Sequence, residues 1–348
     1  MVLLNKTGKI TLADNKTNIV LPFEIKDDFK SLKINFEYSP KTLEDKAKEI
    51  KIAEDCLEKY GEVQEGNIEN YLPIKNLVTV SLDSSREYLG AAHRQSNKQE
   101  HIISPDFSSV GFFKTDIAKG EWKITLNVHS VSCDVDYTIT CHTIHSDGDF
   151  TVSELQKAAA DDHLAIIALT DHNTFSGWDE LDDNIIPAIR GIEWTTYFGH
   201  MLVLGANDFV DWRDAQPDNI DEKIKQVKAV GGIVGIAHPY QLGSPLCTGG
   251  RWEFNVRDWR NVDYIEVWHQ NLYSAKRENE RALELWTSLL DKGYKIAATY
   301  GRDWHREETS GHYGCTYVDV DDISAKSVMR AIRLGKTVIS HGAKFIFR

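Results

Sequence analysis

Histidine and acidic residues recur along the second part of the chain, each after a short apolar segment. The series begins at residues 142–147, which read His-Thr-Ile-His-Ser-Asp, and continues with Asp171 and His172. Its later members are Glu193, His200, His238, Asp303 and His305. Imidazole and carboxylate groups together suit zinc, manganese or iron, and a carboxylate can bridge two ions. Because burying many ionisable groups in one place is costly unless cations neutralise them, the series predicts a shared metal site.

Each residue of the series also has an ordinary structural interpretation. A histidine after an apolar run, such as His238, is usually a hydrogen-bonded residue of the core or its rim. Asp171 alone is typical of a helix cap or a turn, and Glu193 alone is typical of a solvated strand end. Their joint occurrence favours a common metal site, because one assumption then explains all of them.

The elements expected to position these residues alternate between strand and helix. Short apolar runs predict strands at residues 164–169, 186–192, 201–204, 233–237, 262–267 and 295–299. Helical spacing predicts helices at residues 152–163, 220–230, 275–292 and 325–334. This alternation is typical of βα repeats around a parallel sheet or barrel. The polar residues follow the strands, so they are expected at the carboxyl ends, where such barrels place their working groups.

The first part of the chain alternates apolar and polar residues in short runs. The pattern is clearest at residues 31–37, 77–82 and 121–128, and a period of two is typical of half-buried antiparallel strands. Residues 42–60 instead have helical spacing and stop before Gly61, which predicts a single helix. A β-sandwich-like domain with one helix is the expected architecture.

Length and composition limit the remaining alternatives. The chain has 348 residues, enough for two domains, which we place at residues 1–138 and 139–348. Its net charge of −13 without a basic block argues against extended nucleic acid as a partner. No apolar run approaches the 18 residues of a membrane span, and the N-terminus does not resemble a signal peptide. The five cysteines are widely spaced, which argues against a disulfide framework and favours a reducing, cytoplasmic location.

Six segments of the second domain resemble, in order, the motifs of the polymerase-and-histidinol-phosphatase (PHP) family. They are Cys141-His-Thr-Ile-His-Ser-Asp-Gly148, Leu169-Thr-Asp-His-Asn-Thr174, Gly191-Ile-Glu193, Gly199-His-Met-Leu-Val-Leu-Gly205, Ala237-His-Pro239 and Gly301-Arg-Asp-Trp-His305. The resemblance covers nearly all of residues 141–348, and the β-rich domain is similar to that of the branch with carbaryl-type hydrolases. It implies an α/β fold with a distorted, TIM-like (β/α)7 barrel that binds two to three divalent ions.

The resemblance also implies a role for individual residues. There would be three groups of metal ligands, and Glu193 would bridge the first two: His142, Glu193 and Asp303 for the first ion, Glu193, His200 and His238 for the second, and Asp147, His172 and His305 for the third. The acidic ligands expected to be catalytic are Asp147, Glu193 and Asp303. His145 is expected to line the substrate pocket.

One position departs from the family pattern. The first motif of the family begins with His-x-His, whereas this chain has Thr140 before His142. Residues i and i+2 of a strand face the same way and can bind one ion together. A neutral hydroxyl is a weak ligand for these metals, so the first ion is expected to bind less tightly or to take a water there.

The resemblance implies a phosphoesterase that acts on a small phosphorylated metabolite or nucleotide, with a metal-bound hydroxide as its nucleophile. The loop residues Arg302, Tyr240 and Arg251 are expected to bind the anionic substrate. Hydrolysis of a carboxylic ester or carbamate is the alternative reaction, because the same hydroxide could attack a carbonyl carbon. A degenerate module that binds metal without turnover is the alternative outside the enzymes. The oligomeric state is open.

Overall fold

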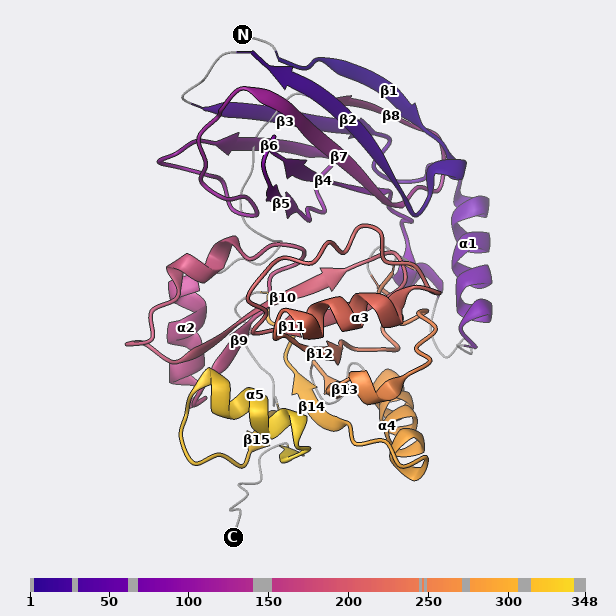
Figure 1. The fold of residues 1–348 in the computed structure, drawn as a ribbon. Helices are drawn as coiled ribbons and strands as arrows, with labels where there is room; N and C mark the ends of the chain where they lie inside the picture. The colour runs from indigo at the N-terminus through magenta and orange to yellow at the C-terminus, as the bar shows by residue number, and fades with distance from the viewer. Residues whose placement is uncertain are drawn as a thin grey trace. The chain divides into compact units, whose positions relative to one another are not determined.

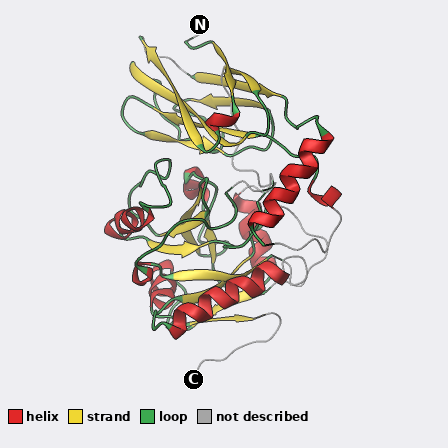
Figure 2. Ribbon diagram, turned by 90° about the vertical axis from the view of Figure 1, so that its right-hand side faces the viewer, coloured by secondary structure: helices red, strands yellow, loops and turns green. Residues whose placement is uncertain are grey.

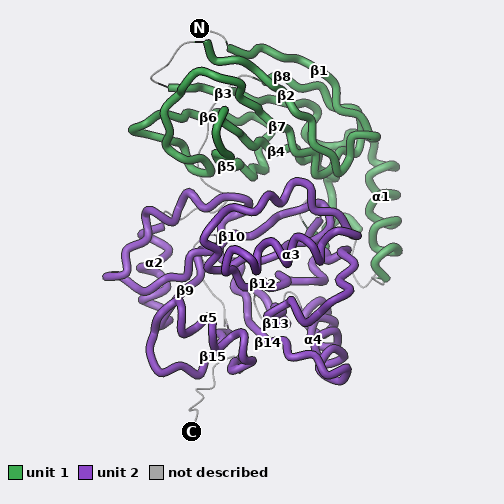
Figure 3. The backbone as a smooth tube through the Cα atoms, in the orientation of Figure 1, with its two compact units in different colours: residues 1–147, 242–248 green, residues 148–241, 249–348 purple. Residues whose placement is uncertain are grey.

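The computed structural model describes residues 3–26, 31–61, 68–139, 152–243, 246, 249–270, 276–305 and 314–340. The chain forms two compact units, coloured separately in Figure 3. Unit 1 comprises Met1–Asp147 and Leu242–Thr248, and unit 2 comprises Gly148–Gln241 and Gly249–Arg348. The sequence predicts a single boundary at residue 138 and contains no sign that a short later segment belongs to unit 1.

Unit 1 is built from two four-stranded antiparallel sheets (Figure 1). One sheet has the order β1 (Lys6–Ile10), β8 (Val135–Ile139), β3 (Leu32–Ser39) and β6 (Lys98–Ile103). The other has the order β2 (Thr17–Ile25), β7 (Gly120–Ser130), β4 (Leu77–Asp83) and β5 (Tyr88–Ala92). Every pairing in both sheets is antiparallel.

The alternation in the sequence explains how these sheets pack. In β3 the buried residues are Leu32, Ile34, Phe36 and Tyr38, and the residues between them are exposed. Successive side chains of a strand point to opposite faces, so this pattern buries one face of the sheet only. Both sheets contribute to one apolar core, in which Trp122 of the second sheet is fully buried. The predicted sandwich is confirmed.

Among the described residues of unit 1, one α-helix, α1 (Lys46–Lys59), accompanies the sandwich. The Asp45 side chain caps its start by accepting a hydrogen bond from the Lys48 amide (3.1 Å). After its end, Gly61 has a φ of +64°, a conformation that glycine adopts without a steric penalty. Cys56 on α1 is disulfide-bonded, whereas Cys133 and Cys315 are free. The cysteine spacing did not indicate this bond, because a disulfide depends on which distant residues folding brings together.

Unit 2 combines strands with helices, in contrast to the strand-rich unit 1 (Figure 2). Its main sheet is curled like half a barrel. The strand order is β14 (Ala297–Gly301), β13 (Tyr264–His269), β12 (Ile233–Ile236), β11 (His200–Leu204), β10 (Ala188–Thr195) and β9 (Ile167–Leu169). A separate pair consists of β15 (Cys315–Val318) and β16 (Thr337–Ser340). The six strands predicted from apolar runs are confirmed, and closure into a seven-stranded barrel stays a prediction.

One strand runs against the predicted parallel repeat. β11 is antiparallel to both β10 and β12, whereas β9 with β10, β12 with β13, and β13 with β14 are parallel. Only four residues separate the end of β10 at Thr195 from the start of β11 at His200. A parallel crossover needs a dozen or more residues, so this connection can only form a hairpin.

The described residues of unit 2 form four α-helices, which Figure 1 shows around this sheet. They are α2 (Val152–Asp161), α3 (Ile220–Ala229), α4 (Lys276–Asp291) and α5 (Ala325–Arg333), each within two residues of its predicted bounds. α5 packs on the sheet through Val328 and Ile332, which are four residues apart on one helix face. In the described part of the chain, no helix is long and apolar enough to cross a membrane.

Candidate metal centre

The strand ends that face the predicted site have an unusual backbone. Asn173, His238, Gln270 and Asp303, which follow β9, β12, β13 and β14, have φ values of +56°, +24°, +53° and +52°. Such values are uncommon for residues other than glycine and cost free energy, and they cluster at functional sites. Each of these four strands is therefore followed by a residue with a strained backbone, and the sequence predicts metal ligands at the same strand ends.

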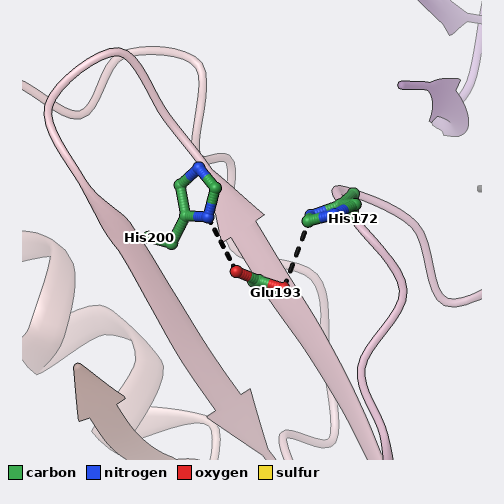
Figure 4. Close-up of side chains that lie close together, drawn as sticks. All are labelled: His172, Glu193 and His200. Carbon is green, nitrogen blue, oxygen red and sulfur yellow. Dashed lines mark hydrogen bonds and ion pairs between the residues drawn. The ribbon is translucent and has the colours of Figure 1, made fainter. Parts of the chain in front are cut away.

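Glu193, near the end of β10, is the centre of the site (Figure 4). Its side chain is 5% exposed. Oε1 lies 2.8 Å from His200 Nδ1 and 3.2 Å from His238 Nε2, and Oε2 lies 3.4 Å from His172 Nδ1. The ligand atoms of His172, Glu193 and His200 all lie within 4.8 Å of one another. The three imidazoles thus surround one buried carboxylate. The prediction of a carboxyl-end position is wrong for His200, which is the first residue of β11, because this antiparallel strand begins beside the end of β10.

The hairpin and a side-chain clamp hold these groups in place. Glu193 and His200 lie on paired strands, with Thr195 of β10 opposite His200 of β11. Asn173 joins the end of β10 to the chain after β9, since its Nδ2 donates to the Thr195 carbonyl and its Oδ1 accepts from the Thr195 amide, both at 2.9 Å. The Thr195 hydroxyl in turn contacts His172 Nδ1. These contacts fix the orientation of the His172 ring toward Glu193.

The pKa values of Glu193, His200 and His238 are shifted in different directions. Burial alone would raise the pKa of Glu193, but the charges and hydrogen bonds of the three imidazoles outweigh burial and lower that pKa well below its usual range. Burial lowers the pKa of His200, and its bond to Glu193 does not fully offset this. Burial also opposes charge on His238, yet Glu193, Asp303 and Glu266 together raise its pKa to about 9. His238 therefore carries the proton, although His200 is closer to Glu193, because His238 faces more carboxylates.

His172 also lies close to a further imidazole, that of His305. His305 Nε2 lies 3.4 Å from His172 Nε2. His305 Nδ1 donates to the Asp303 carbonyl (2.9 Å), which leaves the lone pair of a neutral ring on Nε2. Two nitrogens bound to one tetrahedral zinc ion at roughly 2.05 Å would be about 3.3 Å apart. The separation of these two atoms therefore suits two ligands of one cation.

Glu266 on β13 is a buried acid that the sequence analysis did not identify. Its Oε2 accepts a hydrogen bond from the His238 amide (3.0 Å) and so holds the strained turn at His238. Burial raises the pKa of Glu266 to about 7, with the nearby His238 acting against this and Glu193 and Asp303 adding to it. The signal in the sequence is an acid inside the apolar run Tyr264-Ile-Glu-Val267, where a purely structural strand has no use for a carboxylate.

Gly301, the last residue of β14, provides a test of the Glu266 position. A Cβ at residue 301 would overlap Glu266 Oε1. We expect Gly301→Ala to lower the free energy of unfolding by about 1–3 kcal/mol, because the core must shift to make room. Chemical denaturation measures this loss. Adding Glu266→Asp shortens the acid and is expected to recover part of the lost free energy of unfolding. A double variant that loses more free energy than the two single variants together would contradict the position of Glu266 beside residue 301.

His269, at the end of β13, is a second residue that the sequence analysis did not identify. Its ring is 2% exposed and its centroid lies 5.6 Å from that of His238. Its Nδ1 bonds Asn279 Oδ1 on α4 (2.9 Å). Burial, with the charge of His238, lowers the pKa of His269 to about 4, so the ring is neutral at pH 7. Only its position after an apolar strand could have indicated it.

The other predicted residues have varied surroundings. Asp303 accepts a hydrogen bond from Gln270 Nε2 (3.4 Å) and lies beside His305. Arg302 forms an ion pair with Asp162 and stacks on Trp304, 3.4 Å from the ring centroid. The guanidinium groups of Arg251 and Arg281 both lie over the ring of Tyr240, at 5.0 and 4.8 Å from its centroid. Four predicted positions lie outside the described residues: Thr140, His142, His145 and Asp147.

The donor set fits a divalent cation. It consists of imidazole nitrogens and carboxylate oxygens, which suit zinc, manganese and iron. Buried polar groups are normally hydrogen-bonded. His238 Nδ1 and His269 Nε2 are buried, and neither has a hydrogen-bond partner within the described ranges. The described residues thus form a candidate metal centre, and the identity and number of ions stay predictions.

Comparison with known proteins adds a distant structural similarity. No protein-family model matches the chain, and no curated protein matches it. Among solved structures, the chain is similar to a two-domain protein from Bacteroides vulgatus that contains a predicted PHP-like metal-dependent phosphoesterase. The two chains are 20% identical, with a TM-score of 0.44, and the match covers 56% of this chain. It spans 61% of the length of that protein.

Proposed function

We propose that unit 2 is a metal-dependent hydrolase that cleaves a phosphoester in a small metabolite or nucleotide. The observation that carries the proposal is the buried carboxylate of Glu193, in contact with the imidazoles of His172, His200 and His238 at the strand ends. A purely structural core would not collect four ionisable groups at this cost. The phosphoester class is supported by the six ordered segments that resemble PHP motifs, as is closure of the sheet into a (β/α)7 barrel.

The residues would divide into ligands and supporting groups. The ligands would be His172, Glu193, His200, His238, Asp303 and His305 together with His142 and Asp147. Divalent ions bound there would activate a water molecule and polarise the oxygen of the scissile group. Thr195 would orient His172, and Glu266 would hold the backbone of His238. Such supporting contacts typically change metal affinity or activity by about 10–100-fold.

The side chains that bind the substrate would come from loops at the same edge of the sheet as the metal centre. Arg302 would present its guanidinium beside Asp303, with Asp162 and Trp304 fixing its orientation. Tyr240 and Arg251, held together by their cation–π contact, would add a second polar position, and His145 would line the pocket. Guanidinium groups suit the planar, bidentate recognition of phosphate oxygens.

A substrate panel tests the proposal directly. The full chain, stripped with a chelator and reloaded with zinc or manganese, would be assayed on phosphomonoesters, phosphodiesters and aryl esters. We expect hydrolysis of one phosphoester class that disappears on chelation and returns with the metal. Activity confined to aryl esters would instead identify a carboxylic ester or carbamate hydrolase. Metal binding without turnover of any substrate would identify a binding module.

Thr140 provides a prediction for the first ion. We expect Thr140→His to increase the affinity for that ion about tenfold or more, because a second imidazole two residues before His142 would face the same way. Calorimetric titration with zinc measures the change. Thr138→His is the control, since Thr138 is an exposed residue of β8. Equal affinities in the two variants would contradict the alignment of the first motif.

A further inference from the structure

One ring nitrogen of His269 is hydrogen-bonded, whereas the other has no hydrogen-bond partner among the described residues. Asn279 on α4 makes three contacts with it: Oδ1 accepts from the His269 amide (3.0 Å) and from Nδ1 (2.9 Å), and Nδ2 donates to the His269 carbonyl (3.2 Å). The two backbone contacts determine which end of the Asn279 amide is the oxygen. Because that oxygen can only accept, Nδ1 carries the hydrogen and Nε2 carries the lone pair.

The lone pair on Nε2 is buried, and the His269 ring lies next to a ring of the candidate centre. Within the described residues, Nε2 has no hydrogen-bond partner. A buried acceptor without a hydrogen bond destabilises the folded state, so such groups are uncommon in folded proteins. The neighbouring ring is His238, whose Nδ1 is also buried and unpartnered. The next residue, Gln270, has a strained backbone and donates to Asp303.

A histidine ligand to a metal has a recognisable arrangement. Its other ring nitrogen almost always donates to a carboxylate, a carbonyl or a water, which fixes the tautomer and the direction of the lone pair. Asn279 provides this contact for His269. By contrast, a histidine that only fills a core position would have both nitrogens satisfied or would be replaced by an apolar side chain.

The geometry points to His269 as a further metal ligand, which binds a divalent cation through Nε2 and is positioned by Asn279. This inference rests on the proposed metal centre and adds a residue from β13, a strand to which the sequence analysis assigns no ligand. The cation would lie where the carboxylate of Asp303 can neutralise part of its charge.

Titration of the chelator-stripped full chain with zinc or manganese alone tests this inference. We expect His269→Gln to lower the affinity of one ion at least tenfold, while circular dichroism shows that the metal-free variant is still folded. Asn279→Leu, which removes the contact to Nδ1, is expected to weaken the same ion about 10–100-fold. Asn279→Asp retains an acceptor for Nδ1 and is expected to restore most of the affinity. His129→Gln in unit 1 is the control for replacing a buried histidine.

Two further readouts distinguish a ligand from a structural residue. With cobalt as the probe, His269→Gln is expected to shift the visible d–d bands, because an imidazole leaves the coordination sphere. In the unaltered chain, nitrogen-15 NMR of the 13 histidines is expected to show the Nε2 signal of His269 shifting on zinc addition. This measurement does not depend on the folding of a variant.

The outcomes separate this inference from the proposed function. If the unaltered chain binds zinc or manganese but His269→Gln binds it equally well, with an unchanged cobalt spectrum, the ligand assignment is wrong and the metal centre stands. If the unaltered chain binds neither ion, the proposed metal centre and this inference both fail. A change confined to KM for a substrate, with metal affinity unaltered, would also overturn the ligand assignment.

Discussion

Glu193→Gln is expected to remove tight metal binding while leaving the shape of the side chain almost unchanged. In the structure, one carboxylate oxygen serves both His200 and His238, and the other faces His172. An amide has no net charge and offers only one oxygen, so it can neither bridge two ions nor balance a protonated His238. Removing one partner of a buried charged pair costs about 3–5 kcal/mol, which corresponds to a loss of at least 100-fold in affinity.

Calorimetric titration with zinc and metal analysis of the purified variant measure this loss, and the substrate panel measures the accompanying loss of turnover. Glu222→Gln is the matched control, because Glu222 is an exposed acid on α3 that pairs with Lys225. Its metal affinity should equal that of the unaltered chain. Circular dichroism of both metal-free variants separates lost ligation from lost folding. Unchanged zinc binding in Glu193→Gln would mean that any metal site lies elsewhere.

Metal affinity is expected to rise steeply with pH between about pH 6 and pH 9. In the metal-free protein the pKa of His238 is raised to about 9, because Glu193, Asp303 and Glu266 outweigh the effect of burial. His238 is therefore protonated at neutral pH, and a cation must displace that proton to bind Nε2. The pKa of Glu193 is lowered well below its usual range and that of His200 is lowered as well, so both shifts move the titration of these groups toward lower pH.

The sign of the effect follows from the proton on His238, and Glu266, whose pKa is about 7, acts in the same direction because it gains negative charge within this pH range. Below pH 9 each unit of pH is expected to increase the apparent affinity roughly tenfold, about 100-fold from pH 6 to pH 8, and the increase should level off above pH 9. Calorimetry at pH 7 in two buffers of different ionisation enthalpy should show about one proton released per ion. His238→Gln should remove most of this dependence. A pH-independent affinity without proton release would show that His238 is neutral in the metal-free protein.

Local patterns were sufficient for the elements of unit 2. The predicted helices and strands agree with α2 to α5 and β9 to β14, because apolar periodicity is a property of neighbouring residues. The same reasoning placed Glu193, His200 and His238 at strand ends, and the structure brings them together. The strands predicted at residues 186–192 and 201–204 leave eight residues between them, too few for a parallel crossover, so the predicted parallel repeat is wrong at β11, which is antiparallel to β10 and β12.

Sequence by itself determined which residue types stand at the strand ends and that each unit alternates its apolar residues with the period of its own elements. Tertiary structure alone decided that Asn279 on α4 orients His269, that Glu266 supports the His238 turn, and that Cys56 forms a disulfide. The physical reason is the range of the interactions. Periodicity records which face of an element is buried, whereas a hydrogen bond between two elements depends on packing between distant segments, which a local pattern does not encode.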